Sequence, residues 1–151
     1  MHRTIASWFG SGLILARLKG SHSGSGTVGA AVALGMTLLI APFGWQWQVV
    51  AALAATALSL WSAGPFAADG ADPGWIVADE AAGMFVASIG LGLPSTLVAF
   101  VVFRVADITK KFPGVAAAER LHGALGITAD DIVAGLWALA AGWAVQLLVL
   151  A

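Results

Sequence analysis

The chain has 151 residues, of which 60% are hydrophobic and only 10% are charged. Soluble domains average about 45–50% apolar and about 25% charged residues, so this composition predicts one membrane-embedded domain over residues 1–151. The absence of cysteine excludes disulfides, thiolate nucleophiles and cysteine metal sites. Seven basic residues interleave with eight acids to a net charge of −1, so nucleic acid is excluded as a partner.

Charged residues separate three long charge-free stretches. Residues 1–20 come first and carry three basic residues, but serine and glycine interrupt their apolar run. We therefore expect an amphipathic segment at the surface and not a signal peptide. The charge-free stretches that follow are residues 28–66, 81–103 and 132–151.

A spanning helix needs about 20 apolar residues, so the first charge-free stretch must be divided. Residues 42–48 combine proline, glycine and two tryptophans, which is typical of a turn at the membrane interface. The pattern predicts helices at about 28–42 and 48–65 on either side of this turn.

The second stretch contains two glycines and Pro94 within residues 90–94, a strong helix interruption. Two arrangements are compatible with it: short helices at about 75–90 and 95–110 that form a hairpin, or a single kinked span. We favour the hairpin. The last stretch predicts one further helix at about 132–150.

The hairpin has a consequence for topology. It gives an all-α bundle of four to five short transmembrane helices and places every charged residue on the side of the membrane where the chain begins. A single kinked span would instead put Asp107 on the opposite side of the membrane from Asp79 and Glu80. Excess lysine and arginine mark the cytoplasmic side, so we expect the charged face in the cytoplasm.

Residues 21–29 form a loop rich in glycine and serine that leads into the first spanning helix. Free backbone amides at a helix N-terminus favour a bound phosphate, and Gly26 and Thr27 are the candidates here. A loop of this composition is, by itself, more often a plain linker. His22 in this loop is a further candidate, as a proton donor.

Asp79 and Glu80 stand side by side in an apolar run. Carboxylates at membrane depth cost roughly 2.5–3.5 kcal/mol each, so they usually face the protein interior and serve a function. We expect Asp72 to precede or cap their helix and the pair to lie about two turns into it. Adjacent residues point about 100° apart on a helix, so one basic partner in a buried salt bridge would not serve both acids.

Charged residues also mark two later helix ends. Arg104, Asp107 and Lys111 follow helical spacing along one stripe, which by itself is compatible with a surface ladder of ion pairs. At the start of the last helix, Thr128 or Asp130 is expected to act as the cap. Capping leaves Asp131 unexplained.

Carboxylates from three helix ends therefore point to a metal site. Oxygen ligands of this kind suit Mg²⁺, which usually keeps waters and bridges to a substrate phosphate. The chemistry expected is hydrolysis of a phosphomonoester, with Arg104 and Lys110 neutralising the developing charge. The candidate ligands are Asp79, Glu80, Asp107, Asp130 and Asp131.

Taken in order, these pieces resemble the phosphatidylglycerophosphatase A family of bacterial membrane lipid phosphatases. The family's pattern contains GSG and GTxG, D-x(6)-DE-x-x-GM, FR-x-x-D-I-x-K-x-x-P and G-x-x-x-DD-x-x-AG. The matching stretches here are residues 10–12 and 26–29, 72–84, 103–113 and 126–135. Ser25 and Lys111 stand where the family usually has proline.

The resemblance implies Mg²⁺-dependent removal of the terminal phosphate from phosphatidylglycerophosphate, giving phosphatidylglycerol in phospholipid biosynthesis. It implies a multi-pass protein of the bacterial inner membrane with its active site facing the cytoplasm. The implied catalytic residues are Glu80, Asp79 and Asp131; phosphate binding falls to Gly26, Thr27, Arg104 and Lys110, with Asp72 and His22 as additional candidates.

Two other functions compete with this interpretation. A small non-enzymatic transporter would use the same acids for a cation in transit, but it needs polar residues along the spans, and Gln146 is nearly the sole candidate. A structural subunit would have no reason to gather five acids around a Gly-Thr-x-Gly loop. Phosphate release by the purified protein distinguishes the three.

Overall fold

The computed structural model describes residues 1–67 and 73–149, and within these ranges every regular element is helical. The predicted all-α class is therefore confirmed. In chain order the elements are α1 (His2–Ala6), the 3-10 helix η1 (Ser11–Leu13), α2 (Ile14–Lys19), α3 (Ser25–Ile40), η2 (Ala41–Phe43), α4 (Trp45–Ala63), η3 (Gly64–Phe66), α5 (Ala78–Ala87), α6 (Leu93–Thr109), α7 (Val115–Glu119) and α8 (Ala124–Leu148).

Three helical stretches are long and apolar enough to cross a membrane: Ser25–Phe43, Trp45–Phe66 and Ala124–Leu148. Helix α6, with 17 residues, lies at the lower limit of roughly 17–25 for a span, and α5 with 10 is too short. Large apolar side chains on these helices remain exposed, Leu39 at 74% and Leu53 at 67% among them. This is the arrangement expected where lipid surrounds the bundle.

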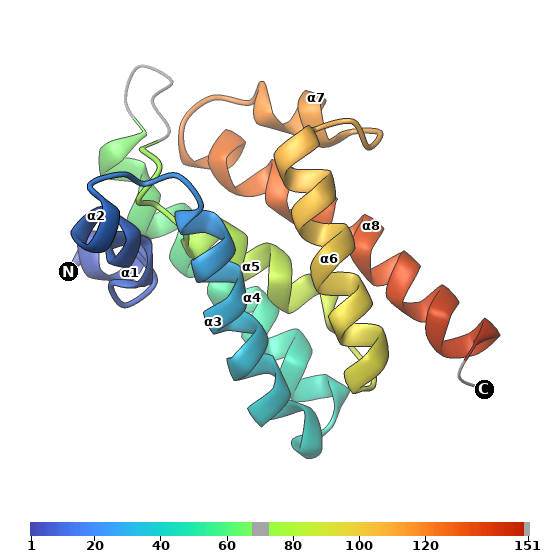
Figure 1. The fold of residues 1–151 in the computed structure, drawn as a ribbon. Helices are drawn as coiled ribbons and strands as arrows, with labels where there is room; N and C mark the ends of the chain where they lie inside the picture. The colour runs from blue at the N-terminus through green and yellow to red at the C-terminus, as the bar shows by residue number, and fades with distance from the viewer. Residues whose placement is uncertain (68–72, 150–151) are drawn as a thin grey trace.

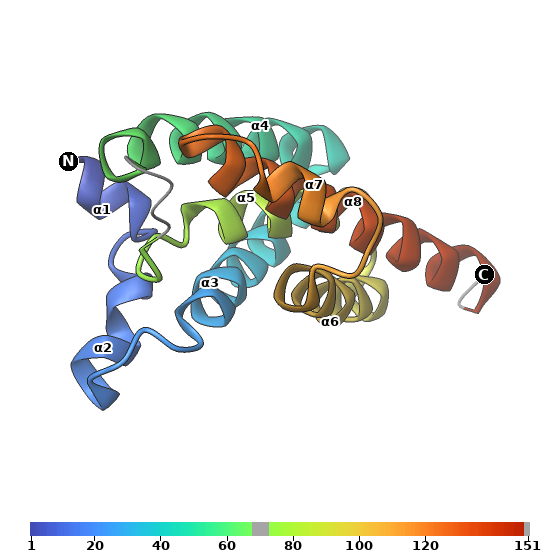
Figure 2. The ribbon, with the colours of Figure 1, turned by 90° about the horizontal axis from the view of Figure 1, so that it is seen from above.

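The short helix α5 occupies the centre of the bundle. Figure 2 shows α4 and α8 on one side of it and α3 and α6 on the other. Its side chains are accordingly buried along most of its length, including Met84 and Phe85. A polar group carried by α5 is thus held inside the protein and away from lipid.

Small residues allow α5 and α8 to approach closely. A Cβ added at Gly135 would lie 2.5 Å from the carbonyl oxygen of Gly83, and one added at Gly83 would lie 2.6 Å from the carbonyl oxygen of Asp131. Neither position can accept a side chain without separating the helices. Backbone contact through small residues is the usual way in which membrane helices associate.

The favoured hairpin is present. Helix α5 ends at Ala87, the chain turns at Gly90 with φ of 72°, and α6 begins at Leu93 with Pro94 in its first turn. Figure 1 shows α6 running back, so that its last residues return to the end of the bundle where α5 starts. A single kinked span over these residues is therefore wrong.

The N-terminal segment packs against the bundle and does not simply lie on its surface. Trp8 is buried and meets Phe85 edge to face, with ring centroids 6.0 Å apart. The amide of Val77 donates a hydrogen bond to the carbonyl oxygen of Ala6 at 2.8 Å. The segment is thereby fixed to the residues that precede α5.

Two predicted helix boundaries were wrong. The last helix begins at Ala124 and not near residue 132, so Asp130 and Asp131 lie about two turns inside α8 and cap nothing. Conversely, α5 begins only at Ala78, which places Asp79 and Glu80 in its first turn, because Val77 has non-helical backbone angles and its amide is hydrogen-bonded to Ala6 of α1. The predicted cap Asp72 lies outside the described residues.

Candidate metal and phosphate site

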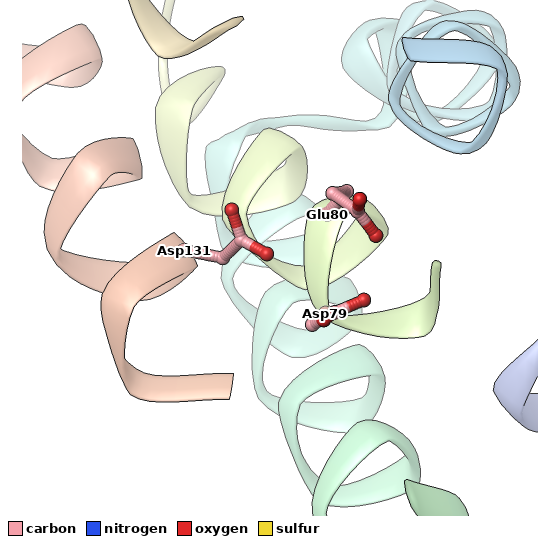
Figure 3. Close-up of side chains that lie close together, drawn as sticks. All are labelled: Asp79, Glu80 and Asp131. Atoms are coloured by element: carbon pink, nitrogen blue, oxygen red, sulfur yellow. The ribbon is translucent and has the colours of Figure 1, made fainter. Parts of the chain in front are cut away.

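Three carboxylates from two helices form a cluster inside the bundle. Asp79 and Glu80 from α5 and Asp131 from α8 each offer an oxygen atom, and these atoms all lie within 4.8 Å of one another. Figure 3 shows Asp131 reaching from α8 toward the first turn of α5. Asp79 and Asp131 are only 4% and 3% exposed. We call these three residues the acidic triad.

The position of the triad follows from the local structure of each helix. Asp79 and Glu80 lie at the N-terminus of α5, where free amides and the helix dipole favour negative charge. Asp131 has no such support, because it lies well inside α8. Its carboxylate reaches the triad because α5 and α8 touch one turn further along, at Gly83 and Gly135.

Some triad oxygens have no protein partner in the described part of the chain. Glu80 Oε2 and Asp131 Oδ1 are both buried there without a hydrogen bond. A buried carboxylate oxygen left in this state is costly unless a proton or a cation satisfies it. Clustered hard oxygen donors of this kind fit a divalent cation such as Mg²⁺.

Gly26 brings the glycine-rich loop against the triad. It lies in the first turn of α3, and a Cβ at this position would collide with Glu80 Oε1. The same Cβ would come within 2.9 Å of Arg104 Nη2. Only glycine leaves room for both charged groups, so the start of α3, Glu80 and Arg104 form one contiguous site.

Beside the triad, two cations neutralise two further acids. Arg104 Nη1 lies 2.6 Å from Asp107 Oδ2, and Lys110 Nζ lies 2.8 Å from Asp107 Oδ1. Lys110 also pairs with Asp130. Its backbone is left-handed, with φ of 53°, at the C-terminal end of α6. The Lys110 ammonium group thus links the C-terminal end of α6 to α8.

Lys110 is charged under all ordinary conditions. Partial burial acts to lower the pKa of its ammonium, but Asp107 and Asp130 outweigh this effect and raise the pKa above its usual value. A permanent positive charge here offsets the acids that surround it. The pairing also fixes Asp107, which in turn holds Arg104.

The structure separates the predicted site residues into groups. The triad of Asp79, Glu80 and Asp131 gathers as expected, whereas Asp107 and Asp130 are engaged by Lys110 and lie outside it. Thr27 is exposed in the first turn of α3. His22 is also exposed, and its Nδ1 lies 3.4 Å from the carbonyl oxygen of Gly12.

Two positioning residues were missed by the sequence reasoning. Gly83 and Gly135 set the distance between the helices that carry the triad, yet we treated them only as parts of longer motifs. A signal was present: each glycine follows a triad acid by about one helical turn, on the same helix face.

Comparison with known proteins identifies relatives. The family model for phosphatidylglycerophosphatase A matches residues 4–146. Phosphatidylglycerophosphatase A of Escherichia coli (strain K12) is 31% identical over 137 residues, which cover 87% of this chain and 76% of that protein. The enzyme of the same name from Haemophilus influenzae is 38% identical over 80 residues, 50% of this chain and 48% of the relative. No solved structure matches the chain.

Proposed function

Because this chain belongs to the phosphatidylglycerophosphatase A family, we propose that it hydrolyses the terminal phosphomonoester of phosphatidylglycerophosphate to give phosphatidylglycerol. One observation carries the proposal beyond the family name. The acidic triad, the start of α3 and Arg104 meet at one place inside a bundle of membrane-length helices. This joins a candidate metal site to groups that attract a phosphate.

We propose Mg²⁺ as the cofactor, held by Asp79, Glu80 and Asp131. When bound, it would polarise a phosphoryl oxygen and lower the pKa of a coordinated water. The triad fits this ion because its oxygens cluster within 4.8 Å and two of them, on Glu80 and Asp131, have no partner among the described residues. No cysteine in the chain could offer a thiolate as an alternative nucleophile.

The protein's own groups act on the substrate phosphate. Arg104 neutralises the negative charge that develops on the phosphoryl oxygens, and amides in the first turn of α3 around Gly26 add hydrogen bonds to it. A triad carboxylate accepts the proton of the attacking water. Lys110 acts through Asp107, by keeping that carboxylate where it orients Arg104.

The membrane positions the substrate. Helices long enough to cross a bilayer surround the site, so acyl chains can remain in lipid while the headgroup reaches the triad. With lysine and arginine concentrated at the end of the bundle that holds the site, we propose the cytoplasmic face of the bacterial inner membrane.

A transporter finds little support in the spans. Gln146, the main candidate for a polar path, accepts a hydrogen bond from the Gly92 amide at 2.6 Å and donates one to the Gly90 carbonyl at 3.2 Å. Its side chain is thus occupied in holding the turn between α5 and α6. We therefore retain the phosphatase as the single proposed function.

The test is phosphate release from synthetic phosphatidylglycerophosphate by the purified full chain in detergent micelles. We expect release with Mg²⁺, none with a chelator, and recovery when Mg²⁺ is added back in excess. Phosphatidic acid, a lipid phosphomonoester with another backbone, serves as the matched substrate control. Release that is equally fast with the chelator would refute the metal, and no release from either lipid would refute the activity.

A further inference from the structure

A polar hollow in the N-terminal segment plays no part in the proposed phosphatase site. It has a volume of about 470 Å³, and its lining includes Arg3 and Thr4 of α1, Ser7, and Arg17 of α2. Two arginines and Thr4 thus line one space, whereas the Ser7 hydroxyl is already engaged with the backbone of Thr4 and Gly10. Arginine is the side chain that best matches the geometry of a phosphate group.

Neither arginine is neutralised by an acid in the described part of the chain. The ion pairs found there, with nitrogen and oxygen within 4.0 Å, all involve Arg104 or Lys110. Arg3 instead lies over the ring of Trp75, with Cζ 5.5 Å from the centroid. The hollow therefore carries positive charge that an anion could compensate.

Exposed apolar side chains occur in the same N-terminal segment as these charges. Phe9 is 61% exposed and Leu18 is 75% exposed, and Ile14 at the start of α2 is 41% exposed. Basic groups next to large apolar side chains are the composition of segments that lie in the membrane interface. Neither the core nor the acidic triad makes use of these residues.

Phe9 faces outward on a backbone conformation that is unfavourable for a bulky residue. Trp8 and Phe9 have φ of 45° and 58°, a region that bulky residues rarely occupy. Trp8 is buried against Phe85, which fixes the turn, and the next side chain must then face outward. Strain of this kind persists where the surrounding structure enforces it, and it is often linked to function.

We propose that the N-terminal segment is an interfacial anchor whose hollow binds the phosphate of an anionic phospholipid between Arg3 and Arg17. Phe9, Ile14 and Leu18 enter the edge of the acyl layer beside it. The bond from Val77 to Ala6 connects this anchor to the residues that immediately precede the triad. This lipid binding does not depend on the phosphatase activity, so a protein that hydrolyses no substrate should still show it.

The test titrates the detergent-solubilised full chain with phosphatidylserine, an anionic lipid that is not the proposed product, and measures bound lipid by native mass spectrometry. The double variant R3Q/R17Q should bind about 25-fold more weakly, at about fivefold for each arginine near an anionic headgroup. The matched control K111Q/R120Q removes two exposed basic residues elsewhere and should bind like the original protein.

Titrations with other ligands and variants identify what the hollow binds. Phosphatidylcholine should bind more weakly than phosphatidylserine, and inorganic phosphate should compete poorly, because neither offers both negative charge and acyl chains. If R3Q/R17Q does not fold, R17Q alone should still lose about fivefold, and R3K/R17K, which keeps the charge but not the guanidinium geometry, should lose less than R3Q/R17Q. Unchanged phosphatidylserine affinity in R17Q, an equal loss in K111Q/R120Q, or full competition by inorganic phosphate would overturn the proposal.

Discussion

The two ends of helix α5 differ in how their polar groups are paired. At its C-terminal end, the amide of Gly90 donates to Gln48 Oε1 at 2.7 Å, and Trp143 Nε1 donates to the carbonyl oxygen of Ile89 at 3.2 Å. At its N-terminal end, Glu80 and Asp131 keep buried oxygens without a partner in the described residues. The polar groups just after its C-terminal end are paired, whereas Glu80 and Asp131 each keep one oxygen that no described residue pairs with.

This difference separates stability from function within a single ten-residue helix. Paired polar groups at the Gly90 turn stabilise the hairpin in an apolar environment, where an unpaired amide would be costly. The oxygens of Glu80 and Asp131 that lack a partner among the described residues destabilise the protein unless a ligand supplies the missing charge. Substitutions at the triad should therefore reduce activity, and substitutions at the turn should reduce stability.

The largest effect is expected at the triad. Glu80→Gln and Asp131→Asn should each lower kcat by at least about a hundredfold, the scale of losing one electrostatic catalytic group. The melting temperature should not fall, because neutral amides remove repulsion between buried charges. Phosphate release and thermal unfolding in detergent measure both effects. Glu119→Gln, which removes an exposed acid, is the control. Near-normal rates in both triad variants would exclude Glu80 and Asp131 from the mechanism.

A smaller loss of activity is expected from Gly26→Ala. The new methyl group would displace Glu80 or Arg104, and a displacement of about 1 Å at a reacting centre can reduce turnover by about tenfold to a hundredfold. Gly35→Ala on the same helix is the matched control, since a Cβ there meets no atom within 4 Å. Equal kinetics in the two variants would show that the start of α3 lies outside the working site.

At the opposite end, Gln48→Ala should lower the free energy of unfolding by about 1–3 kcal/mol, because it leaves the Gly90 amide without its acceptor. The kcat of the folded protein should stay unchanged. Gln46→Ala, an exposed glutamine two residues earlier, controls for the loss of the side chain. A fall in kcat without a fall in stability would contradict the separation of the two ends.

The smallest effect concerns a neutral bond close to the triad. The Ser59 and Thr128 hydroxyls lie 2.8 Å apart and join α4 to α8 three residues before Asp131. Ser59→Ala should lower the free energy of unfolding by about 1 kcal/mol and leave kcat unchanged. A double-mutant cycle with Thr128→Val isolates the bond. A coupling near zero would show that paired groups at this end contribute no stability.

Much of the fold could be predicted because lipid imposes simple constraints on composition. Three charge-free stretches indicated the helices, and the glycines before Pro94 indicated the hairpin, since both follow from local sequence. The early start of α8 was missed because two adjacent acids resembled a helix cap. These acids lie inside α8, where Asp130 pairs with Lys110 and Asp131 belongs to the triad.

The composition of the site depended more on tertiary contacts than on spacing. That Glu80 and Asp131 meet followed from topology, because the hairpin returns the chain to the same end of the bundle. That Asp107 and Asp130 lie outside the triad could not be predicted, since it depends on the left-handed backbone of Lys110, which directs its ammonium between them. A count of acids does not reveal which of them a lysine will engage.

The contact between Gly83 and Gly135 gives the triad a rigid spacing. Two backbones in direct contact cannot move closer, and no flexible side chain lies between them to absorb a change. The distance from Asp131 to the carboxylates of α5 is therefore set about one turn away from those groups, by atoms that carry no charge. A single methyl group at either glycine would act as a spacer, and it would move the carboxylates of α5 and α8 apart without replacing any of them.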